Sequence, residues 1–397
     1  MPSRSGWGLA VIGIALLASG RVLGSLELFL CGVIALAVLV GAVFYVLGRR
    51  LRLEVRRKIQ PPKVHAGTAS RVDLSLTNRG TRRSPVLTVH DSVSSTHGAR
   101  LNVAPLRAEA NARAAYRLPT AKRGIVQVGP LNVEIADPLG LARTRLVAAG
   151  VSELLVFPTV YDVVPLPQSD SIDPYASAFQ TLALGRSGED FHALRRFDQG
   201  DDLRRVHWPS TARHDELMVR QDERPSLGRV TIAIDNRSGS MNEDQLDLAV
   251  TIAGSIALAA QRQEDLVRVT TSAGGAPRFA VSNADVEGIL SMLAVLELSN
   301  EPAVSAFSNA QTPDAGGAIV FITTEPDLAE SPAIRRLLQS YSGLTTVAID
   351  PSATDDSAPR TGSGSSARKI VVSATNPFPD AWNQTIGARR QVGARSK

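Results

Sequence analysis

The order of apolar and polar positions changes character along the chain, and each change predicts a different kind of structure. Residues 6–48 contain only two charged side chains. Within them, Leu28–Leu47 is an uninterrupted apolar run of about the length that a helix needs to cross a bilayer, and the shorter run Trp7–Gly20 precedes it. We therefore expect a transmembrane helical hairpin over residues 1–50.

The first apolar run has a second interpretation, a cleaved signal peptide, because Arg4 precedes it and small residues lie at Ala18 and Gly20. In both interpretations the positive-inside rule places the following basic residues, 49–58, on the cytoplasmic side. There they are expected to contact anionic lipid headgroups. The predicted location is the cytoplasmic membrane, crossed more than once, with the soluble domains in the cytoplasm.

From residue 51 to about residue 165 the pattern has a period of two. Apolar and polar residues alternate in Leu51–Arg56 and in Val72–Thr77, and further strands are expected at Val86–Val89 and Asn132–Ile135. Turn-forming Pro and Gly residues separate these segments. Short strands with regular turns predict a β-sandwich of about immunoglobulin-like size over residues 51–165, and we expect it to be a spacer or an interaction module.

From Arg229 onward, short apolar strands alternate with amphipathic helices. The expected strands are Val230–Ile234, Leu266–Thr270, Ala318–Ile322, Thr345–Asp350 and Lys369–Ser373, and the expected helices are Leu246–Gln261, Ala284–Leu298 and Ser331–Ser340. This alternation predicts an α/β domain over residues 229–386, with a mostly parallel sheet and helices on both faces. The basic tail, residues 387–397, is expected to be disordered.

The connector between these domains, residues 166–228, contains the stretch that is densest in charged and aromatic groups. Its candidate functional residues are Asp190, Arg195, Asp201, Asp202, Arg204, His207, Trp208 and Arg213. Arginine matches carboxylate geometry, so this stretch is expected to form either an internal ion-pair network or a docking surface for a partner. Gly200 and Asp201 predict a turn into a helix N-cap, and Trp208 is expected to be a packing anchor.

Charge and cysteine content restrict the function. The formal net charge of the 397 residues is +5, and the ten residues Arg49–Lys58 hold six basic side chains and one acidic one, which is also a net +5. The remainder of the chain is neutral on balance, which argues against nucleic-acid binding. The single cysteine, Cys31, excludes an intramolecular disulfide and is compatible with a reducing compartment.

Ligands of open α/β sheets gather at the carboxyl ends of the strands, and the loop after the first expected strand starts at Asp235. This loop resembles that of a von Willebrand factor A-type domain, whose metal-adhesion site has the pattern Asp-x-Ser-x-Ser. Asp235, Ser238 and Ser240 are therefore candidate ligands for Mg²⁺. Arg237 and Gly239 stand where the two Ser residues belong, so a metal-free version of the fold is expected and no cofactor is predicted.

The connector carries a more specific resemblance. GEDFHALRRFDQGDDLRRVHWPSTAR resembles the signature of the family called domain of unknown function 58, through Asp190-Phe191, Leu194-Arg195, Gly200-Asp201-Asp202, Arg204, His207-Trp208 and Thr211-Ala212-Arg213. Members are bacterial, membrane-anchored and have a von Willebrand A-like domain. They are commonly encoded beside MoxR-type AAA+ ATPases, and often beside transglutaminase-like membrane proteins. The resemblance implies a scaffold or adaptor that docks such an ATPase in membrane or cell-envelope assembly.

Motifs for catalysis are weak. Asp202, His207 and Ser210 are close in sequence, but triads are recognised by geometry and there is no G-x-S-x-G elbow. His192, His207 and His214 match no standard zinc spacing, and neither a Walker A loop nor a dinucleotide fingerprint is present. We therefore expect a non-enzymatic protein. A metal-dependent binding protein is the first alternative, and an uncharacterised hydrolase is the second.

Overall fold

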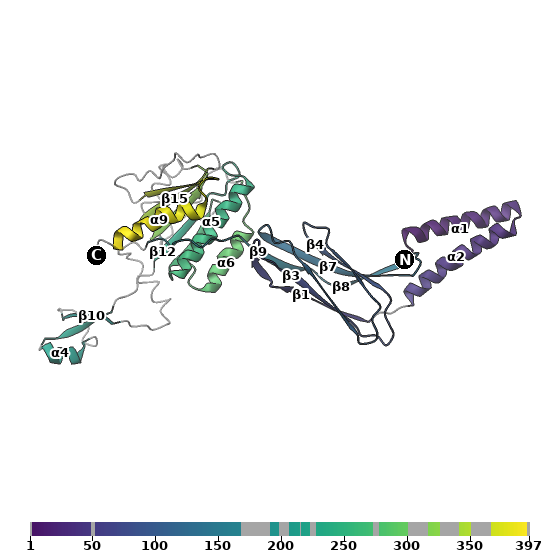
Figure 1. Ribbon diagram of the computed structural model, residues 1–397, viewed down its shortest axis with the longest axis horizontal. Coiled ribbons are helices and arrows are strands. Elements are labelled where there is room, and N and C mark those ends of the chain that lie inside the picture. Colours follow the sequence, from purple (N-terminus) through teal and green to yellow (C-terminus); the bar gives the residue numbers. More distant parts are fainter. Residues whose placement is uncertain are drawn as a thin grey trace. The chain divides into compact units, whose positions relative to one another are not determined.

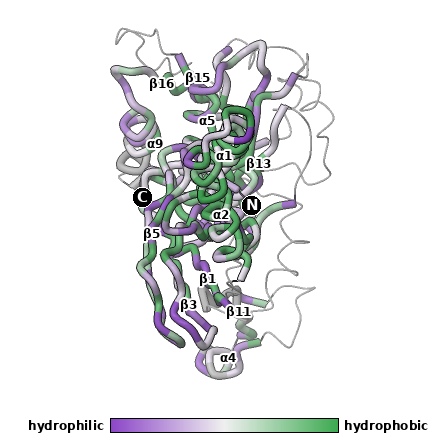
Figure 2. The backbone as a smooth tube through the Cα atoms, turned by 90° about the vertical axis from the view of Figure 1, so that its right-hand side faces the viewer, coloured by the Kyte–Doolittle hydropathy of each residue, from purple (hydrophilic) through white to green (hydrophobic). Residues whose placement is uncertain are grey.

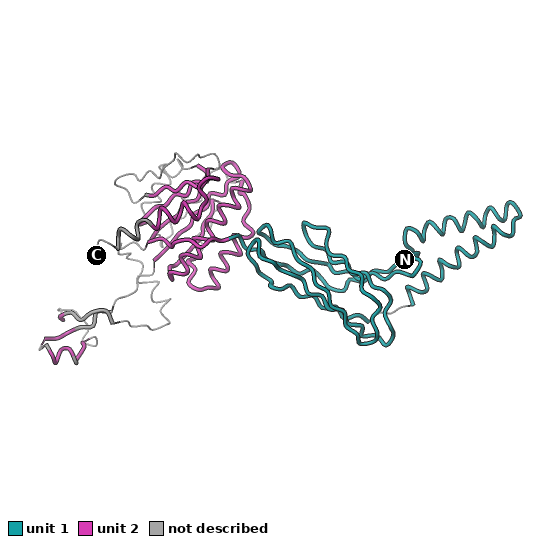
Figure 3. The backbone as a smooth tube through the Cα atoms, viewed as in Figure 1, with its two compact units in different colours: residues 1–159 teal, residues 160–397 magenta. Residues whose placement is uncertain are grey.

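The computed structural model describes residues 2–48, 52–167, 191–197, 206–214, 216–222, 228–272, 278–300, 317–325, 341–350 and 367–394. The chain divides into two compact units, Met1–Thr159 and Val160–Lys397 (Figure 3). Each unit has a hydrophobic core of its own.

The first unit begins with two antiparallel helices, α1 (Arg4–Leu23) and α2 (Leu26–Leu47) (Figure 1). Both are long and apolar enough to cross a membrane, and Figure 2 shows them as predominantly hydrophobic. A Cβ added at Gly32 would lie 2.8 Å from the carbonyl oxygen of Gly13. The close packing of the two helices therefore depends on glycine at this contact.

The helical hairpin holds a turn of the following domain. Ser3 caps α1 by accepting a hydrogen bond from the amide of Gly6. Its own amide donates to the carbonyl of Leu141 at 2.7 Å, and its hydroxyl donates to the carbonyl of Gly140 at 2.6 Å. At the same end of the hairpin, residues of α2 pack against Ala142. The start of α1 is thus attached to the turn at residues 140–142 of the same unit.

The β-domain of this unit is a sandwich of two sheets. One sheet has the order β1-β3-β6, with β1 Leu53–Gln60, β3 Arg71–Asn78 and β6 Asn111–Arg117. The other has the order β2-β9-β7-β4-β5 with β8 added to β7, and consists of β2 Lys63–His65, β4 Leu87–Val93, β5 Ala99–Val103, β7 Gly124–Ala136, β8 Arg143–Ala149 and β9 Ser152–Phe157. Alternate residues of both sheets, such as Leu74 and Val133, share one buried core, which confirms the predicted β-sandwich.

The second unit contains an all-parallel sheet with the order β13-β12-β14-β15-β16. Its strands are β12 Arg229–Ile234, β13 Leu266–Thr271, β14 Ala318–Thr323, β15 Gly343–Ile349 and β16 Ala367–Val372. The helices among the described residues that pack with it are α5 Glu243–Arg262, α6 Asn283–Ala294 and α9 Phe378–Ala394. The predicted parallel α/β fold is confirmed.

The described helices of this sheet share one core with the sheet face that bears Ile232. The opposite face is also buried, since Thr231 and Phe321 are 1% and 2% exposed. The helix expected at Ser331–Ser340, which would bear on the predicted two-sided cover, lies outside the described residues.

Several expected boundaries differ from the structure, among them those of α6 and of the C-terminal tail. Helix α6 ends at Ala294, although its apolar pattern continues to Leu298, because Leu296 and Leu298 pack against the core from an extended segment. Helix α9 continues to Ala394, into the tail that we expected to be disordered. Most residues of that segment are alanine, arginine and glutamine, which favour helix.

Candidate functional site

The second half of the connector forms a small unit of secondary structure, in which the sequence pattern did not predict the two strands. Strand β10 (Phe191–Arg196) pairs antiparallel with β11 (Met218–Asp222), and helix α4 (Trp208–His214) lies between them in the chain. We call these three elements the signature module. Asp190, Asp201, Asp202 and Arg204 lie outside the described residues.

Hydrogen bonds fix the signature module internally. The amide of His207 donates to the carbonyl of Met218 at 2.8 Å. In the other direction, the amide of Met218 donates to the hydroxyl of Thr211 at 3.0 Å. Thr211, a residue of the family motif, therefore attaches α4 to the start of β11. His207 precedes the helix, which begins at Trp208, and the helix start expected at Gly200 and Asp201 lies outside the described residues.

The surface of the module differs from the expectation. Trp208 was predicted to be a packing anchor, but its side chain is 65% exposed, because it stands at the first position of a short helix whose contact with β11 is made by Thr211. Arg213 is also exposed. Arg196 and Glu216 form an exposed ion pair at 2.7 Å. Arg195 lies on β10.

One contact of the suggested hydrolase triad is present. The Nδ1 atom of His207 lies 2.8 Å from the hydroxyl of Ser210. The same two residues are joined by the hydrogen bond from the Ser210 amide to the His207 carbonyl, which is 3.0 Å long. Both contacts belong to the first turn of α4, so the geometry is that of a local helix cap, and a local cap does not by itself build a catalytic site.

A second candidate site lies at the carboxyl edge of the parallel sheet. Successive strands of the chain are found in the sheet in the order 2-1-3-4-5, and ligands of such sheets bind at the switch point between the first and third strands. Here these strands are β12 and β14. Asp235 follows β12, and its amide donates to the carbonyl of Ile322 at 2.9 Å. Thr323 is the last residue of β14.

The carboxylate of Asp235 is fully buried and holds the guanidinium of Arg237. Nε of Arg237 donates to Oδ1 of Asp235 at 2.7 Å, and a terminal nitrogen of Arg237 donates to Oδ2 at 2.8 Å. The same terminal nitrogen lies 3.3 Å from a carboxylate oxygen of Glu325. The hydrogen bond to Asp235 is the main reason that the pKa of Arg237 is raised, so this guanidinium stays charged.

These contacts do not fit a divalent metal ion at the switch point. Both oxygens of Asp235 are occupied by Arg237, and Oδ2 also accepts from the hydroxyls of Ser240 and Thr323, at 3.2 Å each. Ser238 donates to the amide oxygen of Asn300 at 3.1 Å. The structure therefore brings together Asp235 and Ser240 but not Ser238. Among the described residues there is no group of three His, Cys, Asp or Glu that would hold a metal ion.

The loop around this pair is held by a residue that our sequence reasoning missed. The side-chain oxygen of Asn236 accepts from the amide of Ser272 at 3.1 Å and from its hydroxyl at 2.7 Å. The side-chain nitrogen of Asn236 donates to the carbonyl of Glu297 at 2.8 Å. In the sequence, the position of Asn236 directly after a buried strand could have indicated a role at this site. Thr323, at the end of β14, could have been found in the same way.

Comparison with protein families gives a match for one segment of the chain. Residues 193–341 match the model of the family described as "Protein of unknown function DUF58". The match supports that family for this segment, which includes most of the signature module and both strands of the switch point. No curated protein matches the chain.

Solved structures with a similar fold cover only about a quarter of the chain. A CARDB domain from Pyrococcus furiosus has 14% identity and a TM-score of 0.22, with 27% of this chain and 93% of that chain covered. A chain of the complex of Zinc 2-glycoprotein and Prolactin inducible protein from human seminal plasma has 13% identity and a TM-score of 0.21, with coverages of 27% and 96%. At these values the likenesses support no functional conclusion.

Proposed function

We propose that this chain is a non-enzymatic, membrane-anchored cytoplasmic scaffold whose signature module docks a MoxR-type AAA+ ATPase in membrane or cell-envelope assembly. The observation that carries the proposal is the exposure of Trp208, at 65%, on a module with a defined internal hydrogen-bond pattern. Tryptophan and arginine are the side chains most enriched among the residues that dominate binding at protein interfaces. Trp208 and the exposed Arg213 supply this pair within one short helix.

The switch point supports a scaffold over a metal-dependent binding protein. A ligand-capturing metal ion needs free carboxylate and hydroxyl oxygens. Neither carboxylate oxygen of Asp235 is free, because Arg237 donates a hydrogen bond to each of them. The α/β unit, which we propose to be von Willebrand A-like, then acts as a rigid support for the signature module.

The kind of partner rests on the family. The resemblance implies a AAA+ ATPase, with a transglutaminase-like membrane protein as a further partner. The two helices long enough to cross a membrane agree with a membrane anchor. We also propose that the sandwich is immunoglobulin-like, because two sheets pack around one core.

Affinity capture of the tagged full-length chain from its own membranes tests the proposal. We expect the parent protein to retain a AAA+ ATPase, identified by mass spectrometry, and Trp208→Ala to lose it by roughly thirtyfold, since truncation of an anchor residue costs about 2 kcal/mol or more. Tyr161→Ala is the matched control, because Tyr161 is a 44% exposed aromatic residue outside the module. Equal retention by all three proteins would refute docking through the signature module.

A further inference from the structure

The outer face of the three-stranded sheet carries an excess of positive charge. Alternate side chains of a strand point to opposite faces, so residues between the buried positions of β1, β3 and β6 point away from the core. On this outward side lie the cations Arg56, Lys58, Arg71, Arg113 and Arg117 and the acids Glu54 and Asp73. We call the five cations the basic face. Five cationic against two acidic side chains leave a net charge of +3.

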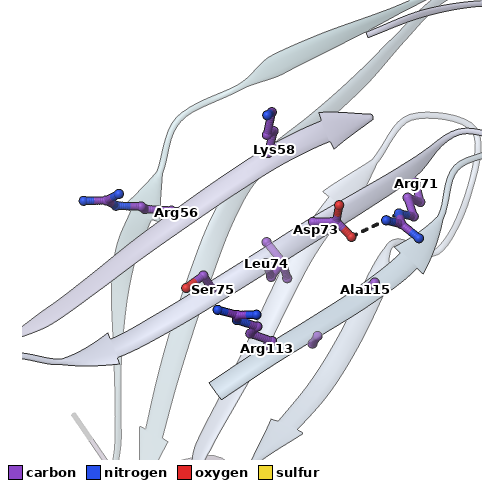
Figure 4. Close-up of a pocket in the computed structure, with 9 residues that line it drawn as sticks. Arg56, Lys58, Arg71, Asp73, Leu74, Ser75, Arg113 and Ala115 are labelled. Atoms are coloured by element: carbon purple, nitrogen blue, oxygen red, sulfur yellow. Dashed lines mark ion pairs between the residues drawn. The ribbon is translucent and has the colours of Figure 1, made fainter. Parts of the chain in front are cut away.

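The register of the strands turns this face into a trough. Ser75 on the central strand lies opposite Arg56 on β1 and opposite Arg113 on β6. The two outer strands are about 10 Å apart, twice the spacing of neighbouring strands. Small side chains, Ser75 and Ala115, form part of the floor, and long cationic side chains stand at its sides (Figure 4). The hollow between them measures about 540 Å³.

The acidic side chains of the face are already engaged. Asp73 pairs with Arg71 at 3.2 Å. Glu54 accepts from Arg79 at 2.9 Å and from Arg56 at 2.7 Å. The hydrogen bond from Arg79 is the main cause that lowers the pKa of Glu54, followed by that from Arg56. Within the part of the chain that the structure describes, no carboxylate pairs with Arg113, so positive charge remains available on the β6 side of the trough.

We propose that the basic face binds an extended acidic segment of a partner protein, with carboxylates at every second position. Residues two apart in a strand are about 7 Å apart, which is the spacing both of Arg56 and Lys58 along β1 and of alternate carboxylates along an extended peptide. The width of the trough admits one extended chain. Electrostatic complementarity of this kind directs both the orientation of a segment and its rate of association.

The geometry favours a polypeptide over lipid headgroups as the occupant. The basic cluster 49–58 was expected to contact lipid, but the side chain of Arg57 turns inward and is 3% exposed, in an ion pair with Asp91. Successive rows of the face lie about 7 Å further along the strands. Arg71 and Arg117 face each other at the end of β1 that is remote from α2. This row lies about 20 Å along the strands from the row of Glu54, well beyond the Debye length of about 8 Å at physiological salt.

The test uses the full chain in nanodiscs of phosphatidylcholine, which offers no net negative charge. The probe is a fluorescein-labelled decapeptide of alternating Glu and Ser, and a decapeptide of alternating Gln and Ser is its uncharged control. We expect the Glu peptide alone to bind, with an affinity that falls as salt is raised. Arg56→Gln/Arg113→Gln should weaken binding about tenfold. Both arginines are exposed, so the fold should survive, which an unchanged hydrogen-exchange pattern checks.

The matched control is Arg143→Gln/Arg145→Gln. It removes the same charge from the other sheet, where both arginines lie near Glu134, and should change the affinity less than twofold. Equal losses in both double variants, or no preference for the Glu peptide, would overturn the proposal. So would displacement of the peptide when phosphatidylglycerol is added to the nanodiscs, because lipid would then be the occupant. The signature module is unchanged in all variants, so the result is independent of ATPase docking.

Discussion

Each of the two units contains a buried pair of an arginine and an aspartate, and the pairs serve different ends. In the sandwich Arg57 binds Asp91 at 2.8 Å, with side chains 3% and 0% exposed. In the α/β unit Arg237 binds Asp235 at 2.7 Å, with side chains 14% and 0% exposed. The chemistry is the same, but the two pairs differ in which parts of the fold they connect.

The sandwich pair connects the two sheets. Arg57 comes from β1 of the three-stranded sheet, and Asp91 from β4 of the other sheet. Asp91 also accepts from the hydroxyl of Tyr116 at 2.6 Å, and Arg57 donates to the hydroxyl of Ser152 at 2.9 Å. Every group in this network is supplied by a different strand. The network therefore holds the two sheets together, and its buried side chains are not accessible to a ligand.

The switch-point pair is local. Arg237 is two residues from Asp235 in the same loop, and it lies at the edge of the sheet, where parallel α/β folds bind ligands. Its second carboxylate, Glu325, is 50% exposed. A long-range pair of this kind holds two layers in register, whereas a local pair at a sheet edge fills a binding position with a cation from the chain itself.

The largest expected effect follows from breaking the sandwich pair. Asp91→Ala leaves the guanidinium of Arg57 buried without its partner, which should destabilise the sandwich by about 3–5 kcal/mol. Hydrogen exchange of the β4 and β7 amides in the full chain measures the free energy of opening. Glu134→Ala is the control, since its partners Arg143 and Arg145 are exposed and the pairs should contribute less than about 1 kcal/mol. A similar small change for Asp91→Ala would contradict an architectural role.

Breaking the switch-point pair should cost less and create a new property. Arg237→Ser leaves the buried carboxylate of Asp235 without its cation, which should destabilise the unit by about 2 kcal/mol. The freed oxygens, with the hydroxyls of Ser240 and Thr323, are then available to a hard cation. We expect Mn²⁺ to restore the thermal stability of Arg237→Ser and to leave the parent protein unchanged.

Asp235→Asn/Arg237→Ser is the control for that experiment, because the amide removes the negative charge and should abolish the response to Mn²⁺. A stabilisation of the parent protein by Mn²⁺ equal to that of Arg237→Ser would show that the arginine does not occupy the metal position. Arg237 would then have no part in keeping a metal ion out of this loop.

The sequence predicted what depends on local pattern. The alternation in Val72–Thr77 gave β3 within one residue at each end, and the apolar run at Val230 gave β12. The direction of a side chain in the assembled sheets was beyond that pattern. Arg57 was grouped with lipid-facing residues, although the period of two turns it inward between Arg56 and Lys58. Its partner, Asp91, lies on a strand of the other sheet, and no local signal connects the two.

At the candidate sites, too, the positions of residues along the chain could be predicted, whereas the contacts of their side chains could not. The position of Asp235 at the carboxyl end of a buried strand was readable from the sequence, and so was the misfit of Arg237 in a metal-binding loop. That Arg237 folds back onto Asp235 depends on side-chain geometry. The exposure of Trp208 depends on which residue attaches α4 to β11. Amino-acid type alone favoured a buried tryptophan.

The smallest expected effect is a change in how the stability of the sandwich depends on pH. Burial, and then the hydrogen bond to Asp91, raises the pKa of Tyr116, so the folded sandwich holds the phenolic proton more tightly than the unfolded chain does. The resulting stability is complete below the ordinary tyrosine pKa of about 10 and is lost as the pH rises above it. Tyr116→Phe should cost about 1 kcal/mol at neutral pH. Unlike the parent, it should lack this loss between about pH 9 and pH 11, measured by hydrogen exchange of β3 and β4. An identical alkaline decline in parent and variant would mean that the phenol of Tyr116 does not titrate with unfolding, and that the Arg57–Asp91 pair holds the sheets together without it.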